Sequence, residues 1–273
     1  MRNYVHPAPS TRFLSKANKR FLRSTPGSKS LQRGLQVLWA FVGGVADLSN
    51  AELAQRTGLP RPTISRLTRS LVDAGFLEYD VEKSVYRLAP VCLSLAAAYR
   101  LSHGYIAVAH PLVVEAANEL KVNLSLVTIS DLHLLYVDGI RAAPGPVRRI
   151  IESGFRAPVD QFVSGRAVIA AMSEAARNDL FDRLAIAYGE QWASAHRTIL
   201  RSMRQFARLG YCSGPSIPGL HAVATAFTAP DGNVFGLVMT YPESAKGGLS
   251  LSEASSAVMR VAAEIGAIWR QLA

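Results

Sequence analysis

The stretch that decides the fold runs from Ser49 to Leu88 and reads SNAELAQRTGLPRPTISRLTRSLVDAGFLEYDVEKSVYRL. It opens with the pattern Ser-x-x-Glu at Ser49 and Glu52, in which each side chain bonds a free backbone N–H at the start of a helix. Gly58 can take a positive φ and end that helix, and Pro62 suits the first turn of the next one, where its missing N–H would be unpaired anyway. The pattern therefore predicts two helices joined by a tight turn.

The second predicted helix, which Gly75 ends, has two different faces. Apolar side chains recur on one face at helical spacing, and they are Ile64, Leu67, Leu71 and Val72. The other face is polar and cationic, and it consists of Arg61, Thr63, Ser65, Arg66 and Arg69. Guanidinium and hydroxyl groups at the start of a helix can pair with base edges in the major groove of DNA, and the positive end of the helix dipole favours phosphate. An ordinary solvated face is the alternative.

A β-hairpin is expected directly after this helix, with strands near 76–79 and 85–88 and a polar turn over 80–84. Upstream, apolar residues at helical spacing predict an amphipathic helix that Gly43 and Gly44 end. Its apolar residues are Leu31, Leu35, Leu38 and Phe41, with Val37 and Trp39 beside them. Helices followed by a hairpin in this order are typical of a winged helix-turn-helix domain that binds double-stranded DNA. We expect phosphate contacts from Arg33 and from the wing residues Lys83 and Arg87.

Composition sets limits on the class of protein. The chain has 273 residues, of which 49% are hydrophobic, so one or two domains with a sizeable core are expected. No run approaches the roughly 18 to 20 apolar residues of a membrane span, and residues 1–29 lack the apolar segment of a secretory signal. The two cysteines, Cys92 and Cys212, have neither metal-binding spacing nor a disulfide framework. These features predict a cytoplasmic protein.

Charge is concentrated at the start of the chain. Residues 1–29 contain seven of the 30 Lys and Arg residues and no acid, while the net charge of the whole chain is +10. Proline, glycine and serine in the same segment favour a disordered tail. The alternatives remain open: a flexible basic arm that adds nonspecific phosphate contacts, or else a misassigned start codon or an idle solvated tail.

The remainder of the chain predicts a linker and a mixed α/β domain. Helices are expected over 91–99 and 105–120, joined near His103 and Gly104. The later patterns predict strands over 123–129, 132–137 and 147–151, a loop over 154–164, helices over 165–187, 191–209 and 251–272, and a hairpin of 223–227 with 234–240 around Pro-Asp-Gly-Asn. The expected α+β architecture has a basic tail (1–29), a winged helix-turn-helix domain (30–90), a linker (91–121) and an α/β domain (122–273).

Short motifs along residues 30–273 resemble those of the isocitrate lyase regulator (IclR) family of bacterial transcription factors. The matching pieces are SLQRGL (30–35), VL (37–38), ELAQRTGLP (52–60), RL (66–67), LVDAGFL (71–77), YRL (86–88), GRA (165–167), Gly210 and the pair Pro218-Gly219. The resemblance implies a linker helix used in dimerisation and a GAF-like domain that binds a small-molecule effector. It also implies a dimer, or a pair of dimers, that regulates a catabolic operon by binding a palindromic operator.

The expected effector site lies between the loop 160–165 and the strands near 212–216 and 222–226. Many relatives have an acidic run in the first strand and a cysteine in the second, where this chain has 212–216 (CSGPS) and Ala222. The residues expected to line the site are Asp160, Phe162, Val163, Ser164, Gly165, Cys212, Ser213, Ala222 and Ala224. Such a lining fits an aromatic or largely apolar acid, with its carboxylate at Ser164 and at the N–H groups that open the Gly165 helix. Two alternatives remain: an inward Asp160 would favour a hydroxyl or amine donor, and Phe162 would fill a collapsed pocket.

Enzyme and cofactor functions have little support in the sequence. The chain has no G-x-S-x-G elbow, P-loop, G-x-G-x-x-G fingerprint or H-E-x-x-H helix. Four residues are candidate metal ligands but lack the close, repeated spacing of a metal site, namely Asp131, His133, Asp160 and His221. His103 and His110 are interpreted as interface or exposed residues, and Cys212 as a small buried hydrophobe. We therefore expect no catalytic residue, metal or cofactor. The alternative function is a small-molecule-binding enzyme with an appended DNA-binding domain.

Overall fold

The computed structural model describes residues 27–42, 46–143, 153–216, 219–242 and 249–272. The chain divides into two compact units, Met1–Ser102 and His103–Ala273, and each has its own hydrophobic core. Most of the basic tail, the glycine pair at 43–44 and the strand expected over 147–151 lie outside the described residues.

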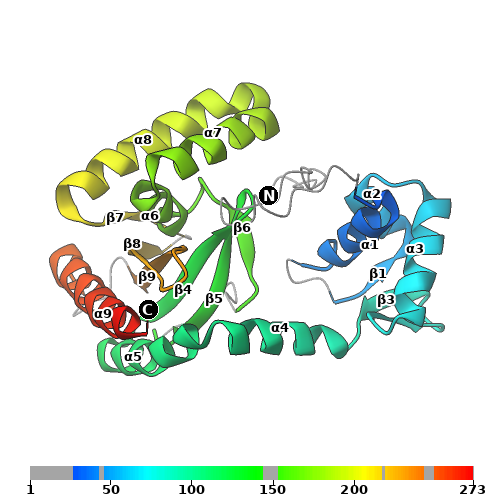
Figure 1. Ribbon diagram of the computed structural model, residues 1–273, viewed down its shortest axis with the longest axis horizontal. Coiled ribbons are helices and arrows are strands. Elements are labelled where there is room, and N and C mark those ends of the chain that lie inside the picture. The colour runs from blue at the N-terminus through cyan, green and yellow to red at the C-terminus, as the bar shows by residue number, and fades with distance from the viewer. Residues whose placement is uncertain (1–26, 43–45, 144–152, 217–218, 243–248, 273) are drawn as a thin grey trace. The chain divides into compact units, whose positions relative to one another are not determined.

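The first unit has the expected helix-turn-helix and wing (Figure 1). Its elements are α1 (Lys29–Trp39), β1 (Leu48–Ser49), α2 (Asn50–Thr57), α3 (Arg61–Asp73), β2 (Leu77–Asp80), β3 (Val85–Leu88) and α4 (Val91–Ser102). The strands form an antiparallel sheet in the order β1-β3-β2. The short strand β1 is not among the expected elements, because two residues are too few to show an alternating pattern.

Local signals begin and end the helices of the first unit where the sequence predicts. The Ser49 and Glu52 side chains form the reciprocal capping box of α2, and Gly58 closes this helix at a φ of 69°. After α3, the N–H of Gly75 donates to Val72 O and the N–H of Phe76 donates to Leu71 O. This pair of bonds is the Schellman arrangement, in which a glycine with positive φ satisfies the last carbonyl groups of a helix.

The buried face of α1 differs from the prediction. Leu31, Leu35 and Trp39 are exposed, although the sequence pattern places them in or beside the apolar stripe. The core is reached instead by Gly34, Val37, Ala40 and Phe41, while Leu38 is partly buried. Two of these residues are small and let neighbouring backbones approach closely, so a pattern based on large side chains identifies the wrong face.

The second unit is built on a six-stranded antiparallel sheet in the order β6-β5-β4-β9-β8-β7. Its strands are β4 (Asn123–Ser130), β5 (His133–Arg141), β6 (Arg156–Pro158), β7 (Cys212–Pro215), β8 (Leu220–Thr228) and β9 (Val234–Pro242). Its helices are α5 (Gly104–Leu120), α6 (Val163–Ala171), α7 (Glu174–Tyr188), α8 (Trp192–Leu209) and α9 (Leu251–Gln271), with a 3-10 turn at Gly189–Gln191. Helices α5 and α9 cover one face of the sheet, and α6, with α7 and α8 beyond it, covers the other (Figure 1). The expected α+β fold class is confirmed.

Two expectations for this unit are wrong in detail. The segment expected as a loop over 154–164 contains β6, which pairs with His133–Leu135 of β5. Helix α6 opens at Val163 rather than at Gly165, and Ser173 caps α7 as a separate helix. Gly165 has a packing role instead, because a Cβ there would approach Val159 O to 2.0 Å.

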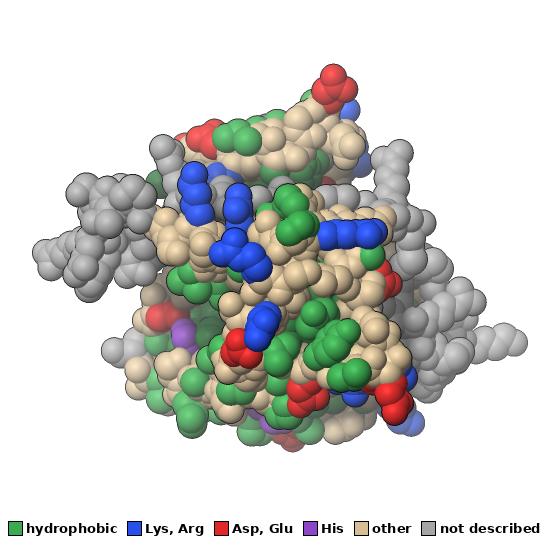
Figure 2. Space-filling model, turned by 90° about the vertical axis from the view of Figure 1, so that its right-hand side faces the viewer, with side chains coloured by type: hydrophobic (Ala, Val, Ile, Leu, Met, Phe, Trp, Pro, Cys, Tyr) green, Lys and Arg blue, Asp and Glu red, His purple; other side chains and the backbone are tan. Residues whose placement is uncertain are grey.

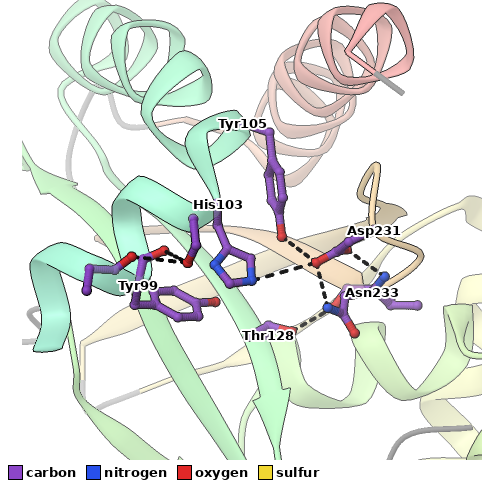
Figure 3. Close-up of polar contacts among 9 residues, drawn as sticks. Tyr99, His103, Tyr105, Thr128, Asp231 and Asn233 are labelled. Carbon is purple, nitrogen blue, oxygen red and sulfur yellow. Dashed lines mark hydrogen bonds and ion pairs between the residues drawn. The ribbon is translucent and has the colours of Figure 1, made fainter. Parts of the chain in front are cut away.

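The turn between β8 and β9 is hydrogen-bonded to the start of α5. The Asp231 carboxylate accepts hydrogen bonds from Asn233 N at 2.9 Å and from the Tyr105 hydroxyl at 2.8 Å, and His103 Nε2 lies 3.9 Å away (Figure 3). Burial alone would raise the pKa of Asp231, but these hydrogen bonds outweigh it and lower the pKa below its usual range. Trp269 Nε1 donates to Tyr105 O at 2.7 Å, so the hairpin tip, α5 and α9 meet at this cluster.

None of the described helices has, by itself, the length and hydropathy to cross a membrane. Helices α4 and α5 reach that length and hydropathy only when they are counted together across the bend between them.

Candidate functional site

Helix α3 presents the basic face that the sequence predicts. Arg61, Ser65, Arg66 and Arg69 are exposed and Thr63 is half-buried, whereas Ile64 on the opposite side is fully buried. Among the described residues, no carboxylate forms an ion pair with any of these three arginines. Figure 2 shows several Lys and Arg side chains gathered on the side of the molecule where α3 lies in Figure 1. These guanidinium groups are free to contact a polyanion.

The start of α3 combines exposed donors with an internal brace. No side chain caps this helix, because Pro60 holds the cap position. The Ser65 hydroxyl donates to Arg61 O at 3.1 Å and accepts from Asn50 Nδ2 at 2.9 Å. Ser65 therefore links α2 to α3, a role that sequence reasoning missed because Asn50 lies 15 residues away.

The two cationic residues of the wing differ in availability. Lys83 is exposed in the turn, where its backbone N–H donates to Asp80 Oδ1 at 3.0 Å. Arg87 instead places its guanidinium 2.8 Å from Asp80 and 3.5 Å from Asp47. The guanidinium of Arg87, which is expected to contact phosphate, is therefore held by two carboxylates in this structure, and its contact with DNA stays a prediction. Arg33 is exposed on α1.

A cavity of about 200 Å³ lies at the start of α6. Four of the nine residues expected at the effector site line it, namely Phe162, Val163, Ser164 and Ala222. Gln161, Pro215 and Ser216 also line it and belong to the segments expected there, although they were not among the nine residues. Sequence reasoning missed Tyr136, Val238 and Thr240. Alternation along β9 places Val238 and Thr240 on one face, but only the sheet register, which sets Ala222 opposite Thr240, brings them to this cavity.

The remaining expected effector residues do not line this cavity. The Asp160 carboxylate accepts a 2.6 Å hydrogen bond from the Tyr188 hydroxyl, so it belongs to a contact with α7 rather than to the pocket. Ser213 accepts from Gln205 Nε2 at 2.8 Å, and Ala224 is fully buried in the core. Gly165 packs closely against Val159.

Cys212 behaves as a buried hydrophobe rather than as a ligand-facing thiol. Its side chain is 1% exposed, and its Sγ donates to Ser202 O at 3.3 Å. Burial raises the pKa of this thiol to about 12, although the nearby charge of Arg166 opposes the shift. A thiol with such a pKa is almost entirely protonated at neutral pH and is a weak nucleophile.

The first turn of α6 contributes polar groups without a described partner to the cavity. The Ser164 side chain is 1% exposed, and its Oγ has no hydrogen-bond partner among the described residues. Phe162 holds the cap position of α6 without a side-chain acceptor, so the first N–H groups of the helix also lack a capping partner. No charged side chain belongs to the described lining. A buried hydroxyl beside an uncapped helix start is suited to an acceptor such as a carboxylate.

The four candidate metal ligands have separate partners. Asp131 lies 3.4 Å from Arg183, and His133 Nδ1 lies 3.1 Å from Arg156. The His221 ring packs beside that of Tyr241, and Asp160 is bonded to Tyr188. Within the described ranges, no group of three or more His, Cys, Asp or Glu side chains is placed to hold a metal ion.

The architecture defines a class: a helix-turn-helix domain with a small sheet, followed by an α/β unit with a curled antiparallel sheet and an internal pocket. A family model described as the IclR helix-turn-helix domain matches residues 30–81. The regulator TsaQ1/TsaQ2 of Comamonas testosteroni is 27% identical over 184 residues, which cover 67% of this chain and 66% of that protein. The chain spans about half to two thirds of the length of the first curated relatives it matches.

Solved structures agree with this assignment. The IclR-family regulator of Brucella abortus has a TM-score of 0.76 and 27% identity, covering 90% of this chain and 95% of that one. An IclR homologue of Microbacterium hydrocarbonoxydans, solved with 4-hydroxybenzoate, has a TM-score of 0.69 and 18% identity, covering 89% and 100%. The chain is thus similar to IclR-family helix-turn-helix transcriptional regulators: residues 30–81 match the DNA-binding domain of the family, and these relatives share the fold. The relatives are transcriptional regulators rather than enzymes.

Proposed function

We propose that this protein represses or activates a catabolic operon by binding operator DNA with α3 and a small aromatic acid in the α6 cavity. The observation that carries the proposal is the buried, unpartnered Ser164 hydroxyl at the uncapped start of α6. Regulators of this kind act on the chromosome, so the proposed location is the cytoplasm.

The DNA-binding half of the proposal rests on α3. Arg61, Arg66 and Arg69 are exposed on a helix whose opposite face fills the core of the first unit. Arginine can bond guanine O6 and N7 with both arms of its guanidinium, which makes it the commonest base-reading residue in the major groove. We assign Arg61, Thr63, Arg66 and Arg69 to base readout, and Arg33 and Lys83 to phosphate contacts. Ser65 contributes through its brace between α2 and α3.

The size of the cavity supports a ligand with one ring. A cavity of about 150 Å³ lined by aliphatic and aromatic side chains is large enough to bind benzene. The α6 cavity is about 200 Å³, so it has room for a ring with one or two small substituents. The same fold holds 4-hydroxybenzoate in the Microbacterium homologue. A two- or three-carbon oxoacid would leave the walls formed by Phe162, Val163 and Val238 in poor contact.

The polar end of the cavity supports a carboxylate. The start of a helix carries a partial positive charge of about half a unit and free N–H donors. Together with the Ser164 hydroxyl, these donors can satisfy a carboxylate in a pocket that has no lysine or arginine in its described lining. Asp160 does not oppose this binding, because its carboxylate is bonded to Tyr188.

A thermal-shift screen tests this site. We expect 4-hydroxybenzoate or benzoate to raise the melting temperature of the full chain, and glyoxylate to have little effect. Ser164→Ala should weaken the response, since one charge-assisted hydrogen bond is worth about 1.5 to 3 kcal/mol. The matched control is Ser194→Ala, which removes an exposed hydroxyl from α8 outside the cavity. Stabilisation by glyoxylate alone, or a response that Ser164→Ala leaves unchanged, would contradict the proposal.

The exposed apolar side chains of α4 support self-association. Leu93, Leu95 and Leu101 are 74%, 58% and 84% exposed. Apolar side chains exposed to this degree are typical of surfaces that a partner covers. We propose that residues 91–121 link the DNA-binding domain (30–90) to the effector domain (122–273) and join two copies of the chain in a homodimer or a dimer of dimers.

A further inference from the structure

A second and larger cavity lies beside α8, where this helix meets β7 and α6. It has a volume of about 560 Å³ and is enclosed by α8, the edge strand β7 and the Arg166 side chain of α6. This volume falls within the range of roughly 300 to 1,000 Å³ that is usual for small-molecule sites. The DNA-binding face and the α6 cavity do not account for it.

The lining of this cleft is strongly cationic. Arg166, Arg201, Arg204 and Arg208 contribute to it, and no carboxylate does so among the described residues. Helix α8 itself has no acidic residue from Trp192 to Leu209. The three α8 arginines of the lining are exposed, and no described carboxylate forms an ion pair with any of the four arginines of the cleft. Four like charges around one concavity repel each other, so an anion in the cleft would be stabilised.

Arg166 differs from the other three because it is half-buried at the inner wall. Its Nε donates to Ser202 Oγ at 2.9 Å, and its Nη1 donates to Asp160 O at 2.8 Å. Burial lowers the pKa of this guanidinium, although Cys212 and Asp160 oppose the shift. Both acceptors are neutral, and the Asp160 carboxylate is bonded to Tyr188 instead. The interior charge is therefore held in place without an ion-paired partner.

We propose that this cleft binds a small anion with at least two carboxylate or phosphate groups, at a site separate from the α6 cavity. Arginine binds both groups with two parallel hydrogen bonds, which gives strength as well as orientation. Ser213 and Gln205, hydrogen-bonded to each other on one wall, supply neutral polar contacts. Arg166 lies at the inner wall and is reached by a ligand that enters the cleft, which favours a small anion over the convex backbone of a DNA duplex.

The two sites of the second unit are neighbours but have different polar groups. Ser164 and Arg166 are two residues apart on α6, and each belongs to a different cavity. Pro215 of β7 lines both. A ligand of the cleft therefore binds beside the effector pocket without using its hydroxyl or the start of α6.

Calorimetric titration of the full chain at fixed ionic strength tests the proposal. The probes are pyrophosphate and tricarballylate, and acetate is the monovalent control. We expect saturable binding of at least one multivalent anion, and the tighter of the two shows whether the site prefers phosphate or carboxylate. Arg204→Gln should weaken this binding roughly tenfold, the value of one charge-assisted hydrogen bond. The matched control is Arg197→Gln, which removes an arginine of α8 outside the cleft lining and should change the affinity less than about twofold.

Three results would overturn the proposal. The first is that neither anion binds. The second is that Arg197→Gln weakens binding as much as Arg204→Gln, which indicates general attraction to a basic surface. The third is that Arg204→Gln weakens binding to random duplex DNA and leaves binding of the anions unaffected, which assigns the cleft to DNA. Melting curves of both variants show whether each is folded. Ser164→Ala should leave the pyrophosphate titration unchanged, so failure of this site is distinguishable from failure of the effector pocket.

Discussion

Substitutions of single arginines should distinguish recognition of the operator sequence from nonspecific attraction to DNA. Arg66 is exposed on the basic face and has no carboxylate partner among the described residues. We expect Arg66→Ala to weaken binding to the operator by about 1 to 3 kcal/mol and to weaken binding to random duplex much less, because the variant cannot bond a base edge. Arg33→Ala, which removes an expected phosphate contact, should weaken both to a similar degree. Fluorescence anisotropy with the two DNAs measures the difference, and an equal effect of Arg66→Ala on both DNAs would make Arg66 a phosphate contact.

The two cysteines should differ in reactivity because their thiols are buried to different degrees. Cys212 is 1% exposed with a pKa of about 12, whereas Cys92 is only partly buried. In a Cys92→Ser variant at pH 8, we expect a thiol reagent to label almost no protein until denaturant unfolds it. Rapid labelling of the native variant would show that Cys212 is accessible, and would return it to the candidates for ligand contact.

At the scale of elements, we expect the two cationic residues of the wing to act differently, with Lys83 contacting DNA and Arg87 stabilising the wing. Lys83→Gln should flatten the plot of log K against log salt by about 0.9, the value of one phosphate contact. Arg87→Gln should leave that slope unchanged and slightly lower the midpoint of urea unfolding, since it removes partly exposed ion pairs. Salt titrations and urea unfolding of both variants make the comparison. A reduced salt slope in Arg87→Gln would restore its assignment as a phosphate contact.

Elements with local signals could be predicted from the sequence, and those with distant partners could not. The capping box at Ser49, the turn glycine Gly58 and the Schellman glycine Gly75 act within a few residues of their own helices. The brace from Asn50 to Ser65 and the pairing of Arg87 with Asp47 join separate elements. No periodicity within a single element reveals such partners.

The effector pocket shows the same limit. The first turn of α6 could be predicted as its polar end, because a serine and a helix start lie together in the sequence. Its walls at Tyr136, Val238 and Thr240 come from strands whose register is set by the whole sheet. The orientation of Asp160 depends on Tyr188, which lies 28 residues further along.

At the scale of the whole molecule, the positive charge of the N-terminal segment should affect DNA binding. Seven Lys and Arg residues lie in the first 29 residues, with no acid. We expect deletion of residues 1–28 to leave the melting temperature unchanged and to flatten the salt dependence of DNA binding by about 0.9 for each phosphate that the tail neutralises. Repeating the salt titration on the truncated chain checks this, and an unchanged slope would mean that the tail does not touch DNA.

An acid bound at Ser164 is expected to change the affinity of α3 for its operator, and this coupling is the core of the proposed function. The direct measurement is the dissociation constant for DNA from the region upstream of the protein's own gene, with and without 4-hydroxybenzoate, for the unaltered chain and for Ser164→Ala. We expect the acid to shift the constant of the unaltered chain by roughly 5- to 150-fold, the usual range of such coupling, and Ser164→Ala to need roughly tenfold more acid for the same shift. Operator binding that no aromatic acid alters, or an identical response in Ser164→Ala, would contradict it.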